Sequence, residues 1–236
     1  MIIGLTGLYC AGKNHIALLL EKRGIPVLDL DKLGHEAINL EKEQLIQCFG
    51  KEILGEDGLP DRRRLGNTVF GKPEALASLE AIIHPVVNRL SEEWTARRTG
   101  LCVVNAAVLH KSSIINRLDA IIVVRCPLPI RFFRAKRRDK LPLGELVKRF
   151  SSQKDFPRYT AKIKTENKEA KLFLLPADIY IMENSGFSGS RQAAADLEKR
   201  IDAILEGLYG KEKAASGCGY GGRLSGDCIQ RRDPDF

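Results

Sequence analysis

The sequence predicts an α/β fold in three layers, with a five-stranded parallel sheet between two layers of helices. Five short apolar runs alternate with stretches of helical periodicity. Near-continuous apolar runs such as AIIVV are typical of strands that are buried on both faces. The expected strands are MIIGLT (1–6), IPVLDLD (25–31), LCVVNAA (101–107), LDAIIVVRC (118–126) and ADIYIM (177–182).

The first run leads into a glycine-rich loop, GLYCAGKNH, and then into the helical segment HIALLLEKRG. The spacing Gly7-x4-Gly12-Lys13 is that of a phosphate-binding loop, although a structural glycine turn has the same residues. Both glycines allow the positive φ angles that turn backbone N–H groups towards a phosphate, and the helix N-terminus adds partial positive charge. We expect Lys13 to reach the β- and γ-phosphates. The expected ATP-binding residues of the loop are Cys10, Ala11, Gly12, Lys13, Asn14 and His15.

Asn14 stands where such a loop normally has a serine or threonine hydroxyl that binds Mg²⁺. An amide oxygen is also a ligand for hard cations. We therefore expect Asn14 to hold Mg²⁺ directly, through water, or less tightly than a hydroxyl would.

The second run ends in LDLD. Strand alternation places Asp29 and Asp31 on the same side, near the carboxyl end where parallel sheets bind their ligands. A carboxylate there can accept a hydroxyl proton during phosphoryl transfer or support the metal. An alternative role for Asp31 is that of N-cap to a helix that starts at Lys32.

Between the second and third runs, residues 32–100 contain no convincing strand and predict a helical insertion. Its clearest helix is EALASLEAIIHPVVNRLSEEW, and we expect Pro85 to bend or interrupt it.

Further helices are expected after the fourth run. Pro127 and Pro129 favour a helix start ahead of IRFFRAKRRDK, and GELVKRFSSQKDF follows. Residues 140–176 have the charged composition of a lid, and SRQAAADLEKRIDAILEGLYG closes the kinase-like core, which we expect to span 1–210. Residues 211–236 are rich in glycine and lack apolar periodicity, which predicts a disordered tail.

Composition narrows the class of protein. No apolar run approaches the ~18 residues of a membrane helix, and the six cysteines have no metal-ligand spacing, so a cytoplasmic protein without a structural metal is expected. The net charge is +8, and Arg131–Arg149 holds eight basic residues and two acids. Nucleic acid and polyanionic small molecules both attract such a surface. Since the chain has no recognisable nucleic-acid module, the small molecules are favoured.

The order of motifs resembles the dephospho-coenzyme A kinase family from Ile3 to about Leu208. The resemblance rests on GLTG…GK, GIPVLDLD and ADIYIMENSG, and above all on DGLPDRRRLGNTVFGKPEALASLEAIIHPVV. The D-R-x-x-L, V-F and L-E-x-I-x-H-P parts of this last block are not general to phosphate-loop kinases.

The resemblance implies a P-loop NTPase fold with a helical CoA-binding domain at 32–100 and a lid. It implies ATP-dependent phosphorylation of the ribose 3′-hydroxyl of dephospho-CoA with Mg²⁺, by a monomer or small homo-oligomer. Asp31 would be the general base and Lys13 would bind phosphates. The other implied site residues are Arg62 and His84 for the acceptor, Asn184 and Gly186 beside the adenine, and Arg131, Arg134 or Arg137 near the triphosphate, with Arg137 assigned to catalysis.

The chain also departs from the family pattern. Tyr9 and Cys10 crowd the phosphate turn, and the third strand has Asn105, Ala107 and Lys111 where the family has an acid, a proline and an acid. A decayed nucleotide- or CoA-binding protein, or a kinase for another nucleotide, therefore stays open as an alternative. The presence of Lys13, Asp31 and the whole acceptor block favours an active kinase.

Overall fold

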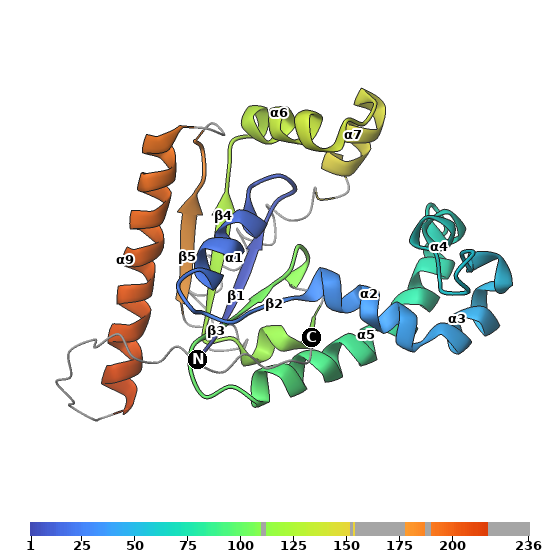
Figure 1. Cartoon of the computed structure of the whole chain (residues 1–236), viewed down its shortest axis with the longest axis horizontal. Coiled ribbons are helices and arrows are strands. Elements are labelled where there is room, and N and C mark those ends of the chain that lie inside the picture. Colours follow the sequence, from blue (N-terminus) through green and yellow to red (C-terminus); the bar gives the residue numbers. More distant parts are fainter. Residues whose placement is uncertain (110–111, 152, 154–177, 187–189, 217–236) are drawn as a thin grey trace, which may run out of the picture.

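The predicted sheet is present in the computed structural model, which describes residues 1–109, 112–151, 153, 178–186 and 190–216 (Figure 1). Its five strands are all parallel and follow the order β2-β3-β1-β4-β5. They are β1 (Ile2–Gly7), β2 (Val27–Asp29), β3 (Cys102–Asn105), β4 (Ala120–Arg125) and β5 (Asp178–Glu183).

Helices account for most of the remaining described chain, and none of them is long and apolar enough to cross a membrane. The helices are α1 (Lys13–Glu21), α2 (Leu30–Leu40), α3 (Lys42–Phe49), α4 (Arg62–Val69), α5 (Pro73–Ala96), α6 (Leu128–Asp139), α7 (Leu143–Ser151) and α9 (Arg191–Ser216), with short 3-10 turns η1 (Lys51–Ile53) and η3 (Ser113–Arg117). Helix α9 continues six residues past the expected end at Gly210, into the segment expected to be a tail. The remainder of that tail, Lys111 and most of the expected lid lie outside the described residues.

The sheet is buried on both faces, as its apolar runs predict. Alternate residues of one strand enter different cores: Leu5 and Ile122 belong to a cluster with α1 and α9, whereas Ile121 and Val123 belong to a cluster with α2 and η3. Gly4 points to the second face, where a Cβ would come within 2.6 Å of Leu109.

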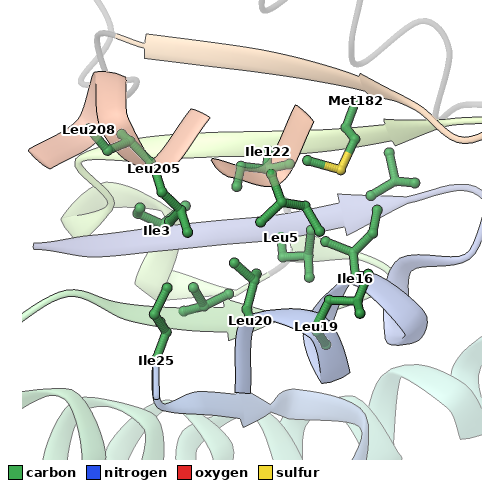
Figure 2. Packing of buried hydrophobic residues seen from close by; sticks show 14 of the residues in the cluster. Ile3, Leu5, Ile16, Leu19, Leu20, Ile25, Ile122, Met182, Leu205 and Leu208 are labelled. Carbon is green, nitrogen blue, oxygen red and sulfur yellow. The ribbon is translucent and has the colours of Figure 1, made fainter. Parts of the chain in front are cut away.

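Figure 2 shows the first of these cores, between the sheet, α1 and α9. Helix α9 contributes an apolar stripe that includes Leu205 and Leu208, and α1 contributes Ile16 and Leu20. The spacing of Leu197, Ile201, Leu205 and Leu208 repeats every three or four residues, which places them on one face of α9.

Helices α2 to α5 extend as an arm beyond the sheet (Figure 1) and have a small core of their own. Ala37, Leu45, Leu65 and Ile83, one from each helix, are buried in it. Of the two expectations for Pro85, the interruption is wrong, because α5 runs unbroken from Pro73 to Ala96, and the bend stays a prediction. Proline removes one backbone hydrogen bond, and the burial of Ile83 and Val86 on either side of it offsets that loss.

We expect Ile201→Ala to destabilise the fold by about 2–5 kcal/mol, because it leaves a cavity between α9 and the sheet. Leu18→Ala is the control, since Leu18 lies on α1 with 47% of its surface exposed. Urea unfolding followed by circular dichroism measures both. Equal midpoints for the two variants would contradict the packing described for α9.

Candidate functional site

The glycine-rich loop joins the end of β1 to the start of α1. Positive φ angles occur at Cys10 (59°) and Gly12 (96°), so the expectation that Gly7 supplies one is wrong. Gly7 ends β1, and a Cβ there would lie 2.9 Å from the carbonyl oxygen of Val124. Glycine is required at this position by the close approach of β4, and at Gly12 by the left-handed turn into the helix.

Asn184 packs against this loop, and Gly186 is joined to it through Arg134. The Asn184 side chain donates to the carbonyl oxygen of Ala11 at 2.9 Å. Arg134 donates to the carbonyl oxygens of Ala11 (3.3 Å) and Gly186 (2.6 Å). A Cβ at Gly12 would come within 2.1 Å of the Asn184 amide nitrogen. The loop and the segment after β5 are therefore one packed unit.

Lys13, the first residue of α1, is a buried cation. Only 8% of the residue is exposed, and its Nζ has no hydrogen-bond partner among the described residues. Burial lowers the pKa of Lys13, while the carboxylates of Asp31 and Asp29 oppose that shift. The nearer of these, Asp31 Oδ2, is 3.6 Å away, which is too long for a hydrogen bond. An ammonium that has no hydrogen-bond partner among the described residues and lies at a helix N-terminus is suited to phosphate oxygens.

The LDLD segment folds differently from the expectation. Strand β2 ends at Asp29 and α2 begins at Leu30, so the two aspartates do not alternate along one strand and Asp31 is not the N-cap. Asp29 is the cap, and its carboxylate accepts from the backbone N–H groups of Asp31 (3.0 Å) and Lys32 (3.4 Å). Asp31 lies in the first helical turn, and 53% of its side chain is exposed.

The amides of Asn14 and Asn105 meet beside these carboxylates. Asn105 Nδ2 lies 3.3 Å from both Asn14 Oδ1 and Asp29 Oδ2. Asn105 is 1% exposed, and its own Oδ1 has no hydrogen-bond partner among the described residues. Asn14 Oδ1 and Asp29 Oδ2 are oxygen ligands of the kind that suits Mg²⁺ rather than a softer metal, whereas Asn105 turns its NH2 group towards them. No described group of three or more histidine, cysteine or carboxylate side chains could hold a metal, so a cation here would depend on amide and phosphate oxygens.

A pocket of about 350 Å³ opens on the other side of Asp31, between α2, α5 and the chain after β3. His84 lines it, as expected, and so does His35, which the sequence reasoning missed. Asp31 and His35 are four residues apart on α2, and this spacing places both on one face of a helix. That spacing could have identified His35. The apolar part of the lining is Leu30, Ile38, Leu79, Ile83 and Val87.

Arg62 does not line the pocket. It is exposed at the start of α4, after the N-cap Asp61, and reaches the site through its charge. The pKa of His35 is lowered by burial and then by the positive charge of Arg62, while Asp31 and Asp29 raise it. Of the two expected acceptor residues, His84 lines the pocket, whereas Arg62 lies outside the lining and acts on the pocket through its effect on the pKa of His35.

The basic helix α6 contacts the loop through one stripe of arginines. Arg131 donates to the Tyr9 carbonyl oxygen at 3.3 Å, Arg134 holds Ala11 and Gly186, and Arg138 lies over the Tyr9 ring. These positions, spaced by three and four residues, share a helix face. Arg137 is exposed, and the described contacts between α6 and the loop come from Arg131, Arg134 and Arg138. Its catalytic role stays a prediction.

The parallel sheet, the loop between β1 and α1 and the buried lysine define a P-loop kinase. Residues 1–168 match the sequence model of the dephospho-CoA kinase family. A dephospho-CoA kinase of Thermus thermophilus is 33% identical over 218 residues, covering 92% of this chain and 96% of the relative. The chain therefore belongs to the dephospho-CoA kinase family and is an enzyme.

Further comparisons agree. A dephospho-CoA kinase of Anaeromyxobacter dehalogenans is 34% identical, covering 89% of this chain and 94% of the relative. A crystal structure from Thermus thermophilus is 32% identical with a TM-score of 0.68, covering 88% of this chain and 97% of that one. The dephospho-CoA kinase of Campylobacter jejuni shares the fold, with 21% identity, a TM-score of 0.55, and 88% and 96% coverage.

We expect His35 to titrate below the ordinary value of 6.5 and Arg62→Ala to raise its pKa, because that variant removes a nearby positive charge. Proton–carbon NMR of the imidazoles, with the His35 signal assigned by its loss in His35→Gln, measures the midpoint. Arg63→Ala changes the neighbouring exposed arginine of α4 and should leave the midpoint in place. An unmoved midpoint in Arg62→Ala would remove Arg62 from the acceptor region.

Proposed function

We propose that this chain transfers the γ-phosphoryl group of ATP to the ribose 3′-hydroxyl of dephospho-CoA, giving CoA and ADP. One observation supports this more than any other: the Asp31 carboxylate lies 3.6 Å from the ammonium of Lys13 and also lines the adjoining pocket. Asp31 is thus the boundary between a phosphate site and an acceptor site. A general base that takes the proton from the hydroxyl of the phosphate acceptor must lie between these two sites.

The donor's phosphates are assigned to the loop. Lys13 Nζ, which has no hydrogen-bond partner among the described residues, is available to the β- and γ-phosphate oxygens, and the first N–H groups of α1 lie at the same end of the helix. Arg131 and Arg134 add positive charge from α6. Asn184 and Gly186, fixed to the loop by Arg134, are assigned to the adenine end. Phosphoryl transfer depends mainly on such positioning and charge.

We assign Mg²⁺ to Asn14 and Asp29, whose oxygens Oδ1 and Oδ2 lie on either side of the Asn105 amide and are of the type that this ion prefers. When bound, the ion neutralises charge on the phosphates. Mg²⁺ commonly binds through one or two carboxylates plus substrate phosphates, and this set offers that number. The amide at residue 105 keeps one negative charge out of the site, which weakens its attraction for a cation.

The acceptor is assigned to the pocket between α2 and α5. Its mostly apolar walls orient the acceptor, while His84, His35 and Asp31 supply polar groups. The ribose 3′-oxygen attacks the γ-phosphorus, the bond from that phosphorus to the bridging oxygen breaks, and ADP leaves. Asp31 takes the hydroxyl proton. We propose that residues 32–100 are the acceptor-binding part of the chain. We also propose that the protein acts in the cytoplasm.

Asp31→Asn should lower turnover by about two to four decades with little change in ATP affinity, because the amide cannot accept the proton. Glu36→Gln, an exposed change on the same helix outside the pocket lining, is the control. The assay supplies ATP, Mg²⁺ and dephospho-CoA and quantifies CoA and ADP by chromatography. Wild-type protein that forms no CoA would refute the proposed function, and a fully active Asp31→Asn would refute the role of Asp31.

Asn14→Ser and Asn14→Thr should reach half-maximal rate at lower Mg²⁺ than the wild type does. A hydroxyl is a more compact ligand, and the octahedral shell of Mg²⁺ tolerates little distortion. Mn²⁺ should support the wild type comparatively well. Initial rates against each metal concentration, at fixed saturating ATP and acceptor, test this. Coincident curves in the three proteins would take Asn14 out of the metal site.

A further inference from the structure

Tyr9, in the middle of the phosphate loop, contacts the α6–α7 helix pair through its backbone, its ring and its hydroxyl. Its N–H donates to Gln153 Oε1 at 2.6 Å, and its carbonyl oxygen accepts from Arg131 at 3.3 Å. Its hydroxyl donates to the Asp139 carboxylate. Its ring meets Phe150 edge-on, with centroids 5.2 Å apart and planes at 77°. The tyrosine therefore packs outward against these helices rather than crowding the turn.

The groups that Tyr9 meets are themselves joined. Asp139, at the end of α6, accepts from Arg138 Nε at 2.7 Å and pairs with Arg149 of α7 at 3.6 Å. The Arg138 guanidinium lies 5.3 Å from the centre of the Tyr9 ring. One carboxylate thus connects the loop, α6 and α7, and the aromatic contacts exclude water around it.

Arg131 depends on the same contacts. It is 9% exposed, its Nε has no hydrogen-bond partner among the described residues, and burial lowers its pKa. The contacts described for its guanidinium are the Tyr9 carbonyl oxygen and the Phe150 ring, 5.3 Å from the guanidinium carbon. A buried charge with few partners is costly, so its orientation rests on these two groups.

We propose that Tyr9 is a positioning residue that couples the phosphate loop to α6 and α7 and thereby orients Arg131 towards the donor's phosphates. Only the kinetic consequence of this inference rests on the proposed function. The ring supplies most of the coupling through Phe150 and Arg138, and the hydroxyl adds the bond to Asp139. Loss of the ring frees Phe150 on the Tyr9 side, so Arg131 keeps its bond to the backbone carbonyl oxygen of residue 9 but packs on a ring that is no longer held in place.

The first test needs no reaction. Backbone hydrogen exchange of Leu143–Ser151 should become at least about threefold faster in Tyr9→Ala, because Phe150 loses its contact with Tyr9 and keeps that with Phe132, 5.8 Å between centroids. Tyr9→Phe should lie between this variant and the wild type. Tyr209→Ala, an exposed change on α9, should leave α7 unaffected. If Tyr9→Ala does not fold by circular dichroism, Phe150→Leu tests the same contact from the α7 side. Unchanged exchange of α7 would overturn the proposal.

The second test separates positioning from a merely structural role. The Kd of ATP, measured by calorimetry without acceptor, and the KM for ATP should both rise about tenfold in Tyr9→Ala, with kcat within about threefold. Tyr9→Phe should recover most of the affinity. Faster exchange with unchanged ATP affinity would overturn the positioning role. Since calorimetry needs no turnover, a wild type that makes no CoA refutes the proposed function and leaves this test intact.

Discussion

The geometry of the site depends on one buried charge, the ammonium of Lys13. A cation withdrawn from water at the head of a helix needs negative partners, and the fold supplies them from a neighbouring crossover. Asp29 and Asp31 are at the junction of β2 and α2, and the strand order places β3 between them and β1. Asp31 pairs with Lys13 by charge without forming a hydrogen bond to it, so the N–H donors of the ammonium have no acceptor among the described residues.

Strand β3, which lies between β1 and β2, places Asn105 in the middle of the site. Asn105 ends β3, between the two elements that face each other, and its amide touches both Asn14 and Asp29. A carboxylate at this buried position would need a cation close by to offset its charge. The amide needs none, and it forms a neutral pair with Asn14 beside the Asp29 carboxylate.

The fold could be predicted from the sequence because its signals are local. Continuous apolar runs gave the five strands, and the glycine loop gave the first turn. The details that were predicted at the wrong residue, the cap of α2 and one positive φ angle of the loop, depend on competition between residues close in the chain. Asp29 caps α2 before Asp31 can, and Cys10 takes the positive φ that a glycine pattern assigns to Gly7. Contacts between distant segments, such as Tyr9 with Phe150, leave no local pattern at all.

The helices α2 and α5 each belong to two cores. Leu33 of α2 and Val87 of α5 pack with the sheet, while Ala37 and Ile83 pack inside the arm. Helix α5 is unbroken at Pro85, so a single continuous helix joins these two regions. Both helices also line the pocket, so the pocket and the core of the arm share the same packing.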